Sequence, residues 1–369
     1  MAEKINGLSR EFIIHPGETL KEILEDRNMS QRELAMRTGV KESHISKLVN
    51  CLKPISVSFA KKLEYAFSID ASFWISLQAN YEKELADFDE INMISKEELE
   101  IVQKIKHITE YIQEIGLLNQ EAQESMQVIQ LRKLLKVSSL TVIPKISQAG
   151  AYRLALADNV DPYILFTWLR ICDLITTSQQ INQEFDIDKL RNKLSLIRKL
   201  TFEEDVEYIH FKLREYLAEC GIKFAIVKHF TGAPVQGVII RNNDETLSLI
   251  MTVRRKFADV FWFTFFHEIG HILNEDIEDK LIDYEFTKNE VEDRADEFAA
   301  NVLIDSGEYN SFVESRDFSL MRISQFCVEQ NIPRFILIGR LQKDGHLKYH
   351  QYSREKIRYD LDKAEKVIH

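Results

Sequence analysis

The spacing of apolar residues is the feature that most limits how this 369-residue chain can fold. From about 95 to 200 they recur every three or four positions, which is the period of an amphipathic helix. The period changes to two within 224–230, 235–241 and 246–253, which predicts three short strands, and helical spacing returns near Asp259. We therefore expect a mainly α protein with a small β-sheet, an α+β fold.

The length predicts more than one domain, since domains usually contain about 100–200 residues. Five short helices are expected within 16–85, with Pro16 at a first helical position and Ser30 and Ser56 as N-caps. The acidic segment 86–93 is expected to interrupt the helical pattern. We place the domains at 1–88, 89–200 and 201–369, the second of them a helical region without recognisable chemistry.

We expect a cytoplasmic protein that does not contact a membrane. No stretch reaches the roughly 18 apolar residues of a membrane helix, and the start of the chain lacks the apolar region of a secretion signal. The absence of a CxxC pair argues against a disulfide framework and a cysteine zinc site, since the four cysteines lie far apart: Cys51, Cys172, Cys220 and Cys327.

The net charge of −11 does not exclude binding to nucleic acid, because the acidic residues are unevenly distributed. Residues 268–308 contain 14 acidic and 3 basic residues, whereas residues 1–80 contain 10 acidic and 11 basic residues. The first 80 residues are therefore nearly neutral and free to meet phosphates.

Residues 30–50, SQRELAMRTGVKESHISKLVN, have the pattern of a helix-turn-helix, with a turn at Gly39. In this motif the second helix, 41–50, enters the major groove of DNA. An ordinary helical bundle with a solvated charged face explains the spacing about equally well. The residues predicted to contact DNA are Gln31, Lys41, Glu42, Ser43, His44 and Lys47.

The segments HPGETLKEIL, SQRELAMRTGV, ISKLVN and ASFWISLQANY make residues 12–85 similar to HigA-type antitoxins of the Xre family. The resemblance implies binding of operator DNA by a homodimer. One departure is Cys51, which stands where that family often has glycine after the recognition helix. A residue other than glycine is strained in the left-handed conformation that commonly ends such a helix.

A second motif, FWFTFFHEIGHILNE at 261–275, contains two histidines four residues apart. His267 and His271 lie on one face of the expected helix, where both can bind one metal ion, and Glu268 projects beside them. A pair of helical histidines that only make structural hydrogen bonds is the alternative. The apolar residues before the motif favour a buried helix that presents its polar side to a cleft.

The helix expected at 290–303, EVEDRADEFAANVL, supplies Glu292 as a third ligand. Asp296 lies one turn later, where its carboxylate can orient a ligand histidine. Two histidines and one glutamate leave a fourth position open on Zn²⁺ for water, as in catalytic sites. Glu268 is then the general base that takes the proton of this water and delivers it to the leaving amine. Candidates for a donor to the developing oxyanion are Tyr284, Tyr309 and Arg340.

Together TVRRKFADVFWFTFFHEIGHIL and VEDRADEFAANVLI resemble the ImmA/IrrE family of zinc metallopeptidases over about 200–345. The segment Leu303–Asp305 departs from that family's usual Leu-Leu-x-Pro. The resemblance implies a zincin-like domain that cleaves a partner repressor or antitoxin. The strand at 246–253 is expected to offer an edge to an extended substrate.

The sequence leaves two functions open. One is a DNA-binding regulator whose zinc endopeptidase cleaves a specific protein, such as a repressor, a partner or the chain itself. The other is an antitoxin-like repressor whose peptidase-like domain binds a toxin or senses a signal without cleavage.

Overall fold

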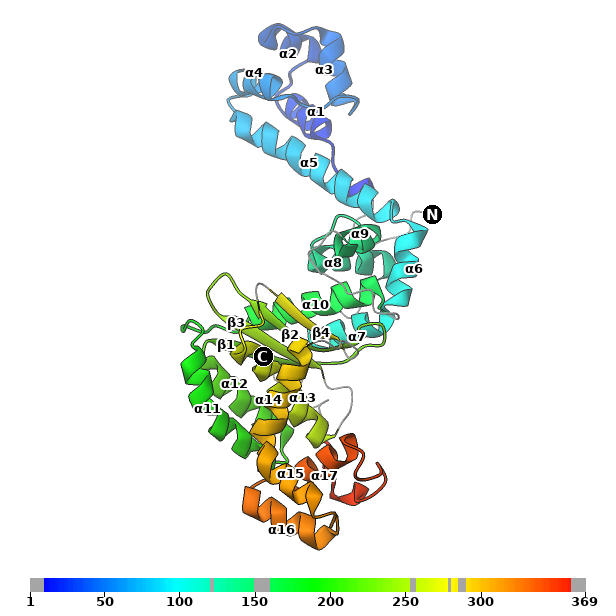
Figure 1. Ribbon diagram of the computed structural model, residues 1–369. Coiled ribbons are helices and arrows are strands. Elements are labelled where there is room, and N and C mark those ends of the chain that lie inside the picture. The colour runs from blue at the N-terminus through cyan, green and yellow to red at the C-terminus, as the bar shows by residue number, and fades with distance from the viewer. Residues whose placement is uncertain are drawn as a thin grey trace. The chain divides into compact units, whose positions relative to one another are not determined.

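The computed structural model describes residues 10–119, 123–148, 160–252, 257–277, 280–284 and 290–359, and has the predicted α+β fold (Figure 1). The chain forms two compact units. The first comprises residues up to 99 with 123–129, and the second comprises the remainder. The domain boundaries expected from the sequence stay a prediction. Within the described residues, no helix is both long and apolar enough to span a membrane.

The first unit contains the five helices expected within 16–85. They pack around a core of Leu20, Leu34, Ile45, Leu63 and Trp74, which are all fully buried. A short 3₁₀ turn, Arg10–Phe12, precedes them. The helices are α1 (Pro16–Asp26), α2 (Gln31–Thr38), α3 (Glu42–Val49), α4 (Val57–Phe67) and α5 (Ala71–Asn92).

The predicted helix ends are confirmed in this unit. Pro16 begins α1, and the side chains of Ser30 and Ser56 cap α2 and α4. Gly39 ends α2 in the left-handed conformation, with φ of 65°. Cys51, two residues after the end of α3, also has a left-handed φ of 60°, a conformation that is strained for a residue other than glycine.

The expectation that residues 86–93 interrupt the helical pattern is wrong, because α5 continues to Asn92. Acidic residues on an exposed helix face do not break the helix when their charges are compensated. Lys83 compensates Asp87 one turn later, with 2.9 Å between Nζ and Oδ2.

The predicted helical character of 95–200 is confirmed for 95–119, 123–148 and 160–200, the residues of this region that the structure describes. The helices that begin in this region are α6 (Lys96–Lys104), α7 (Lys106–Glu114), α8 (Glu124–Leu135), α9 (Ile143–Gln148), α10 (Pro162–Thr177) and α11 (Ile187–Lys199). The rest of the chain adds α12 (Val206–Ala218), α13 (Ala258–Leu273), α14 (Glu290–Leu303), α15 (Ser306–Glu314), α16 (Leu320–Gln330) and α17 (Arg334–Lys343). Further 3₁₀ turns are Leu140–Val142, Leu200–Phe202 and Ser353–Glu355.

The sheet of the second unit contains the three predicted strands and a fourth that the sequence did not indicate. They are β1 (Ile222–Val227), β2 (Val235–Arg241), β3 (Leu247–Thr252) and β4 (Lys280–Tyr284), in the order β1-β3-β2-β4. β3 pairs with β1 in parallel and with β2 in antiparallel orientation. The expectation that this strand offers a free edge is therefore wrong, since both of its edges are already paired.

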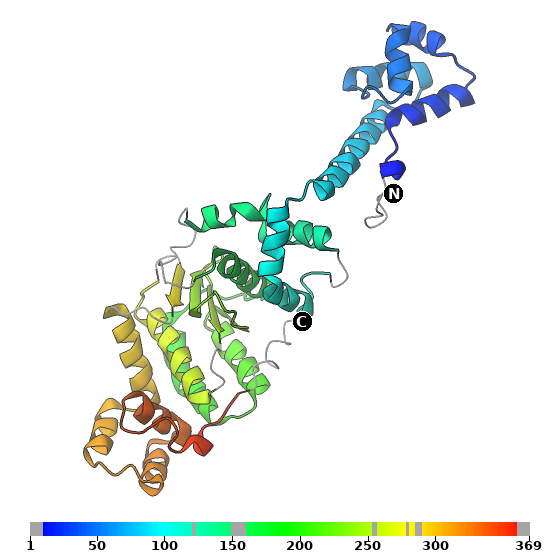
Figure 2. The ribbon, with the colours of Figure 1, turned by 90° about the vertical axis from the view of Figure 1, so that its right-hand side faces the viewer.

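Helices cover both faces of this sheet, as Figures 1 and 2 show. On one face Phe224, Ile239 and Leu249 join a core that includes residues of α11, α12 and α13. On the other face α10 contacts β1, and the indole of Trp168 donates a hydrogen bond to the carbonyl of Lys228. Burial from both sides explains why every residue of β1 and β3 is buried.

The last described residues hold the start of α13 in place. Phe257 forms an antiparallel bridge with Arg358, and the amide of Ala258 donates to the carbonyl of Ile357. The hydroxyl of Tyr359 accepts a 2.8 Å hydrogen bond from the indole of Trp262. Residues 357–359 therefore hold in place the helix that carries both histidines of the predicted metal site.

Candidate metal centre and nucleic-acid interface

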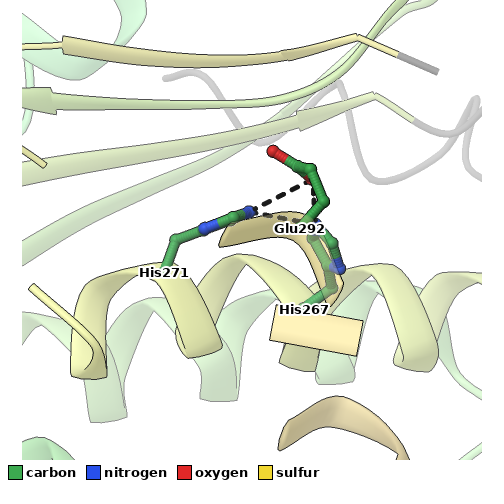
Figure 3. A group of neighbouring side chains, drawn as sticks. All are labelled: His267, His271 and Glu292. Atoms are coloured by element: carbon green, nitrogen blue, oxygen red, sulfur yellow. Dashed lines mark hydrogen bonds and ion pairs between the residues drawn. The ribbon is translucent and has the colours of Figure 1, made fainter. Parts of the chain in front are cut away.

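The structure brings the three predicted ligands together between α13 and α14 (Figure 3). His267 and His271 are buried on one face of α13, and their Nε2 atoms lie 3.0 Å apart. Glu292 reaches them from α14, with Oε2 at 3.1 Å from Nε2 of His267 and 3.5 Å from Nε2 of His271.

Close packing of the two helices places Glu292 within reach. Gly270 of α13 faces Ala295 of α14, and a Cβ added at Gly270 would lie 3.2 Å from the α-carbon of Ala295. Two small residues at this point let the backbones approach each other. Glu292, one turn before Ala295, therefore lies opposite the two histidines.

Each ligand histidine is oriented by a carboxylate at its other nitrogen. Nδ1 of His267 lies 2.8 Å from Asp296, as predicted, and Nδ1 of His271 lies 3.2 Å from Asp276. Sequence reasoning missed Asp276. The only signal in the sequence is its place as an acidic residue just beyond the end of α13. The chain folds back there, and the backbone amide of Asp276 donates a hydrogen bond to the carbonyl of His271.

The donor set fits a zinc ion. In the tautomer whose Nδ1 atoms donate to these carboxylates, both Nε2 atoms present lone pairs, and both lie next to an oxygen of Glu292. Three lone pairs pointing at one another repel unless a cation lies between them. Tetrahedral coordination with Zn–N bonds of about 2.05 Å separates ligand atoms by about 3.3 Å, and the observed separations are 3.0, 3.1 and 3.5 Å.

The carboxylates of the site are held in their charged form. Burial raises the pKa of Glu292, but its contacts with His267 and His271 outweigh burial and hold that pKa at about 2. Burial also raises the pKa of Asp296, and the opposing contacts with His267 and Lys343 bring it below its usual value. A negatively charged ligand is what a divalent cation requires.

Glu268 lies against the sheet. Its side chain is fully buried, and its carboxylate occupies the space beside Gly237 of β2. A Cβ at Gly237 would lie 1.9 Å from Oε1 of Glu268 and 2.2 Å from its Cδ. Only glycine at this position leaves room for the carboxylate.

A cleft of about 910 Å³ opens beside the ligands between α13, α14 and α17. His267 and Glu292 lie at its wall, together with the apolar side chains of Val260 and Phe263. An open cleft of this size can hold several residues of an extended peptide.

The candidate oxyanion donors are not supported by their contacts. The hydroxyl of Tyr309 donates to Asp344 at 2.5 Å, and the guanidinium of Arg340 stacks on the ring of Tyr309. Arg340 lines the cleft but donates to the carbonyls of Ala300 and Ile304 at the end of α14. The side chain of Tyr284 lies outside the described part of the structure.

Five of the six predicted DNA-contacting residues lie within 41–47, at the start of α3 and its first two turns. Lys41, Glu42, Ser43 and Lys47 are exposed, whereas Gln31 is half-buried at the start of α2. His44 is half-buried because its ring packs edge-on against Phe59, with 5.4 Å between ring centroids.

A basic hollow of about 360 Å³ lies on this surface and includes one residue that sequence reasoning missed. Lys53, in the loop after α3, joins Lys41 and Lys47 there. Three ammonium groups around one hollow favour contact with a phosphate of the DNA backbone. The signal for Lys53 was its position close behind the recognition helix.

Comparison with known proteins identifies the first unit. Residues 20–74 match the family model described as helix-turn-helix. Virulence-associated protein I of Dichelobacter nodosus is 34% identical over 84 residues, which cover 22% of this chain and 78% of that protein. The chain belongs to the helix-turn-helix family. Virulence-associated protein A of the same organism is 41% identical over 69 residues, or 18% of this chain and 68% of that protein.

Similar solved structures include two antitoxins. A HigA-family addiction module antidote protein from Coxiella burnetii is 24% identical, covering 27% of this chain and 91% of its own with a TM-score of 0.19. The antitoxin HigA of Pseudomonas aeruginosa, solved with the higBA promoter, is 31% identical and covers 22% of this chain and 96% of its own, with a TM-score of 0.20. This helix-turn-helix protein extends well beyond these matches, which cover at most 27% of the chain.

Proposed function

We propose that this DNA-binding regulator also contains a zinc-dependent endopeptidase that cleaves a partner protein of the repressor or antitoxin class. The observation that carries the proposal is the convergence of three potential ligand atoms, one each from His267, His271 and Glu292. A structural histidine pair does not require a third, negatively charged acceptor at the same point.

These three residues would hold zinc, which when bound polarises the scissile carbonyl and acidifies a water molecule. Glu268 lies one residue from His267 on α13 and is the group assigned to take the proton of that water. Attack of the water oxygen on the carbonyl carbon and cleavage of the C–N bond would follow, and Glu268 would pass the proton to the leaving amine. Asp276 and Asp296 hold the imidazoles so that Nε2 remains a ligand throughout.

The cleft supports a macromolecular substrate. It runs along the face of α13 that carries Val260, Phe263 and His267, so an extended segment in it passes the ligands. The described strand β4 pairs with β2 and lies at the edge of the sheet, so an extended segment would add to β4 and not to β3.

The helix-turn-helix determines where the protein acts. We propose that a cytoplasmic homodimer places two copies of α3 in successive major grooves of a palindromic operator. Lys41, Lys47 and Lys53 then contact phosphates, and the exposed start of α3 faces the bases. Cleavage of a partner bound at the same promoter would change transcription.

The second candidate is an antitoxin-like repressor whose peptidase-like unit binds a partner without cleaving it. One observation favours it, namely that the side chain of Glu268 is fully buried, whereas a general base must reach water. In this case zinc stabilises the fold and the cleft serves as a docking groove.

Two measurements separate these functions. Metal analysis of the purified chain should give one zinc per chain, and His271→Ala should abolish it. Cells expressing the wild type or Glu268→Gln are then compared by mass spectrometry of labelled protein amino termini. New termini that depend on Glu268 support the endopeptidase, whereas identical termini in both strains, with zinc bound, support the platform.

A further inference from the structure

Each carboxylate that orients a ligand histidine is itself held by a cation. Oδ1 of Asp276 lies 2.9 Å from a guanidinium nitrogen of Arg294, while its Oδ2 faces His271. Oδ2 of Asp296 lies 3.2 Å from Nζ of Lys343, while its Oδ1 faces His267. The same three-part arrangement of cation, carboxylate and imidazole therefore occurs twice, once for each histidine.

A cation at the second oxygen restricts the orientation of the carboxylate. It holds the carboxylate plane so that one oxygen stays aligned with Nδ1, and it lowers the tendency of that carboxylate to turn and bind the metal itself. A histidine oriented in this way loses less entropy when its Nε2 binds zinc. The cations thus act on the metal through the carboxylates without touching it.

The two arrangements differ in burial. The side chain of Asp276 is 7% exposed, so its charge depends on a fixed partner, and Arg294 supplies one with a rigid guanidinium. Asp296 and Lys343 are 46% and 55% exposed, so water and salt screen their interaction. The Lys343 ammonium also lies 3.8 Å from the centre of the Phe263 ring, which keeps it at the cleft.

We infer that Arg294 and Lys343 are positioning residues for the two histidines, and that Arg294 has the larger effect on zinc affinity. Arg294 links α14 to the segment after α13, whereas Lys343 links α17 to α14. The inference rests on the proposed zinc site and adds the residues that adjust its affinity.

The test is the zinc dissociation constant of the full chain, measured by competition with a chromophoric chelator. Removing a partner of a ligand histidine typically weakens metal binding about 10–100-fold, so we expect that range for Asp276→Asn. For the cations we expect about 10-fold for Arg294→Gln and about 3-fold for Lys343→Gln. Arg191→Gln, which removes an exposed pair with Asp188 far along the chain, is the matched control and should change nothing.

The melting temperature of the zinc-free variants tells positioning from a purely structural role. Arg294→Gln with a near-normal melting temperature and weaker zinc binding supports the inference. If both fall, combining Arg294→Gln with Asp276→Asn decides: no further loss of affinity beyond that of Asp276→Asn supports action through the carboxylate, whereas additive losses overturn the inference. Wild-type affinity in Arg294→Gln also overturns the inference, while a wild type that binds no zinc overturns the proposed function itself.

Discussion

Replacing Gly237 by alanine tests whether the buried carboxylate of Glu268 lies against β2. The new Cβ would lie 1.9 Å from Oε1 and 2.2 Å from Cδ of Glu268, where a normal contact is about 3.5 Å. The carboxylate or the strand must therefore move by about 1.5 Å. Because both groups are buried, we expect a loss of about 1–3 kcal/mol of unfolding free energy, as in other overpacked cores.

The assay is a double-mutant cycle by chemical denaturation in the presence of EDTA, which keeps metal out of the comparison. Glu268→Ala removes the carboxylate and makes room for the new methyl group. In that background Gly237→Ala should be neutral or stabilise by about 0.5 kcal/mol, since alanine lowers the entropy of the unfolded chain. Gly307→Ala, whose Cβ would meet only the Asp305 carboxylate at 3.2 Å, is the control for a glycine replacement.

An equal loss from Gly237→Ala in both backgrounds would refute the placement of Glu268. The destabilisation would then come from the strand itself. A loss that disappears with Glu268→Ala shows that the strand residue fixes the position of the proposed base. The zinc affinity of Gly237→Ala should remain within a few-fold of wild type, because the three atoms nearest to the added Cβ all belong to Glu268, which is not a proposed ligand.

Three further predictions concern other parts of the chain. Cys51→Gly should raise the unfolding free energy by about 0.5–1 kcal/mol, because glycine relieves the left-handed φ of 60°, while Cys51→Ala should give no gain; equal midpoints for all three in urea denaturation would contradict this. Burial, aided by the charge of Arg214, lowers the pKa of His210 to about 4. The stability that the neutral imidazole contributes is therefore fully present above the unfolded pKa of about 6.5 and is lost as the pH drops towards 4. Urea denaturation should show that the wild type loses about 3 kcal/mol more than His210→Leu between pH 7 and pH 4, and parallel pH profiles would speak against a buried neutral imidazole. Lys47→Gln should weaken binding to a random-sequence DNA duplex and reduce the slope of log K against log salt by about 1, whereas Lys21→Gln should not; an unchanged slope would place Lys47 away from phosphate.

Much of the local structure was predictable from the sequence, because it follows from interactions between near neighbours. Apolar spacing predicted α13 and α14, with α14 at the expected bounds 290–303. Serine caps and Gly39 marked the helix ends of the first unit. The break predicted at the acidic segment 86–93 was wrong, because the composition of the segment resembles that of a linker. The i,i+4 charge pair of Lys83 with Asp87 instead favours a helix.

Interactions between distant segments were the part that sequence reasoning missed. β4 pairs with β2 across about 40 residues of chain, and β3 is enclosed between two strands, so neither its pairing nor its lack of a free edge follows from a period of two. Asp276 is an ordinary acid in sequence and becomes a partner of His271 only where the chain turns back.

The sequence by itself determined that two histidines share one helical face, since residues four apart on an α-helix always lie on the same side. It also determined the helix-turn-helix, whose turn and core lie within a few dozen residues. Only the tertiary structure decided that Glu292 meets the histidines, because this depends on how closely Gly270 and Ala295 let two helices pack. The same holds for the carboxylates and cations around the site and for the space that Gly237 leaves for Glu268. Packing brings residues that are far apart in the sequence into contact, and a local sequence pattern does not specify these contacts.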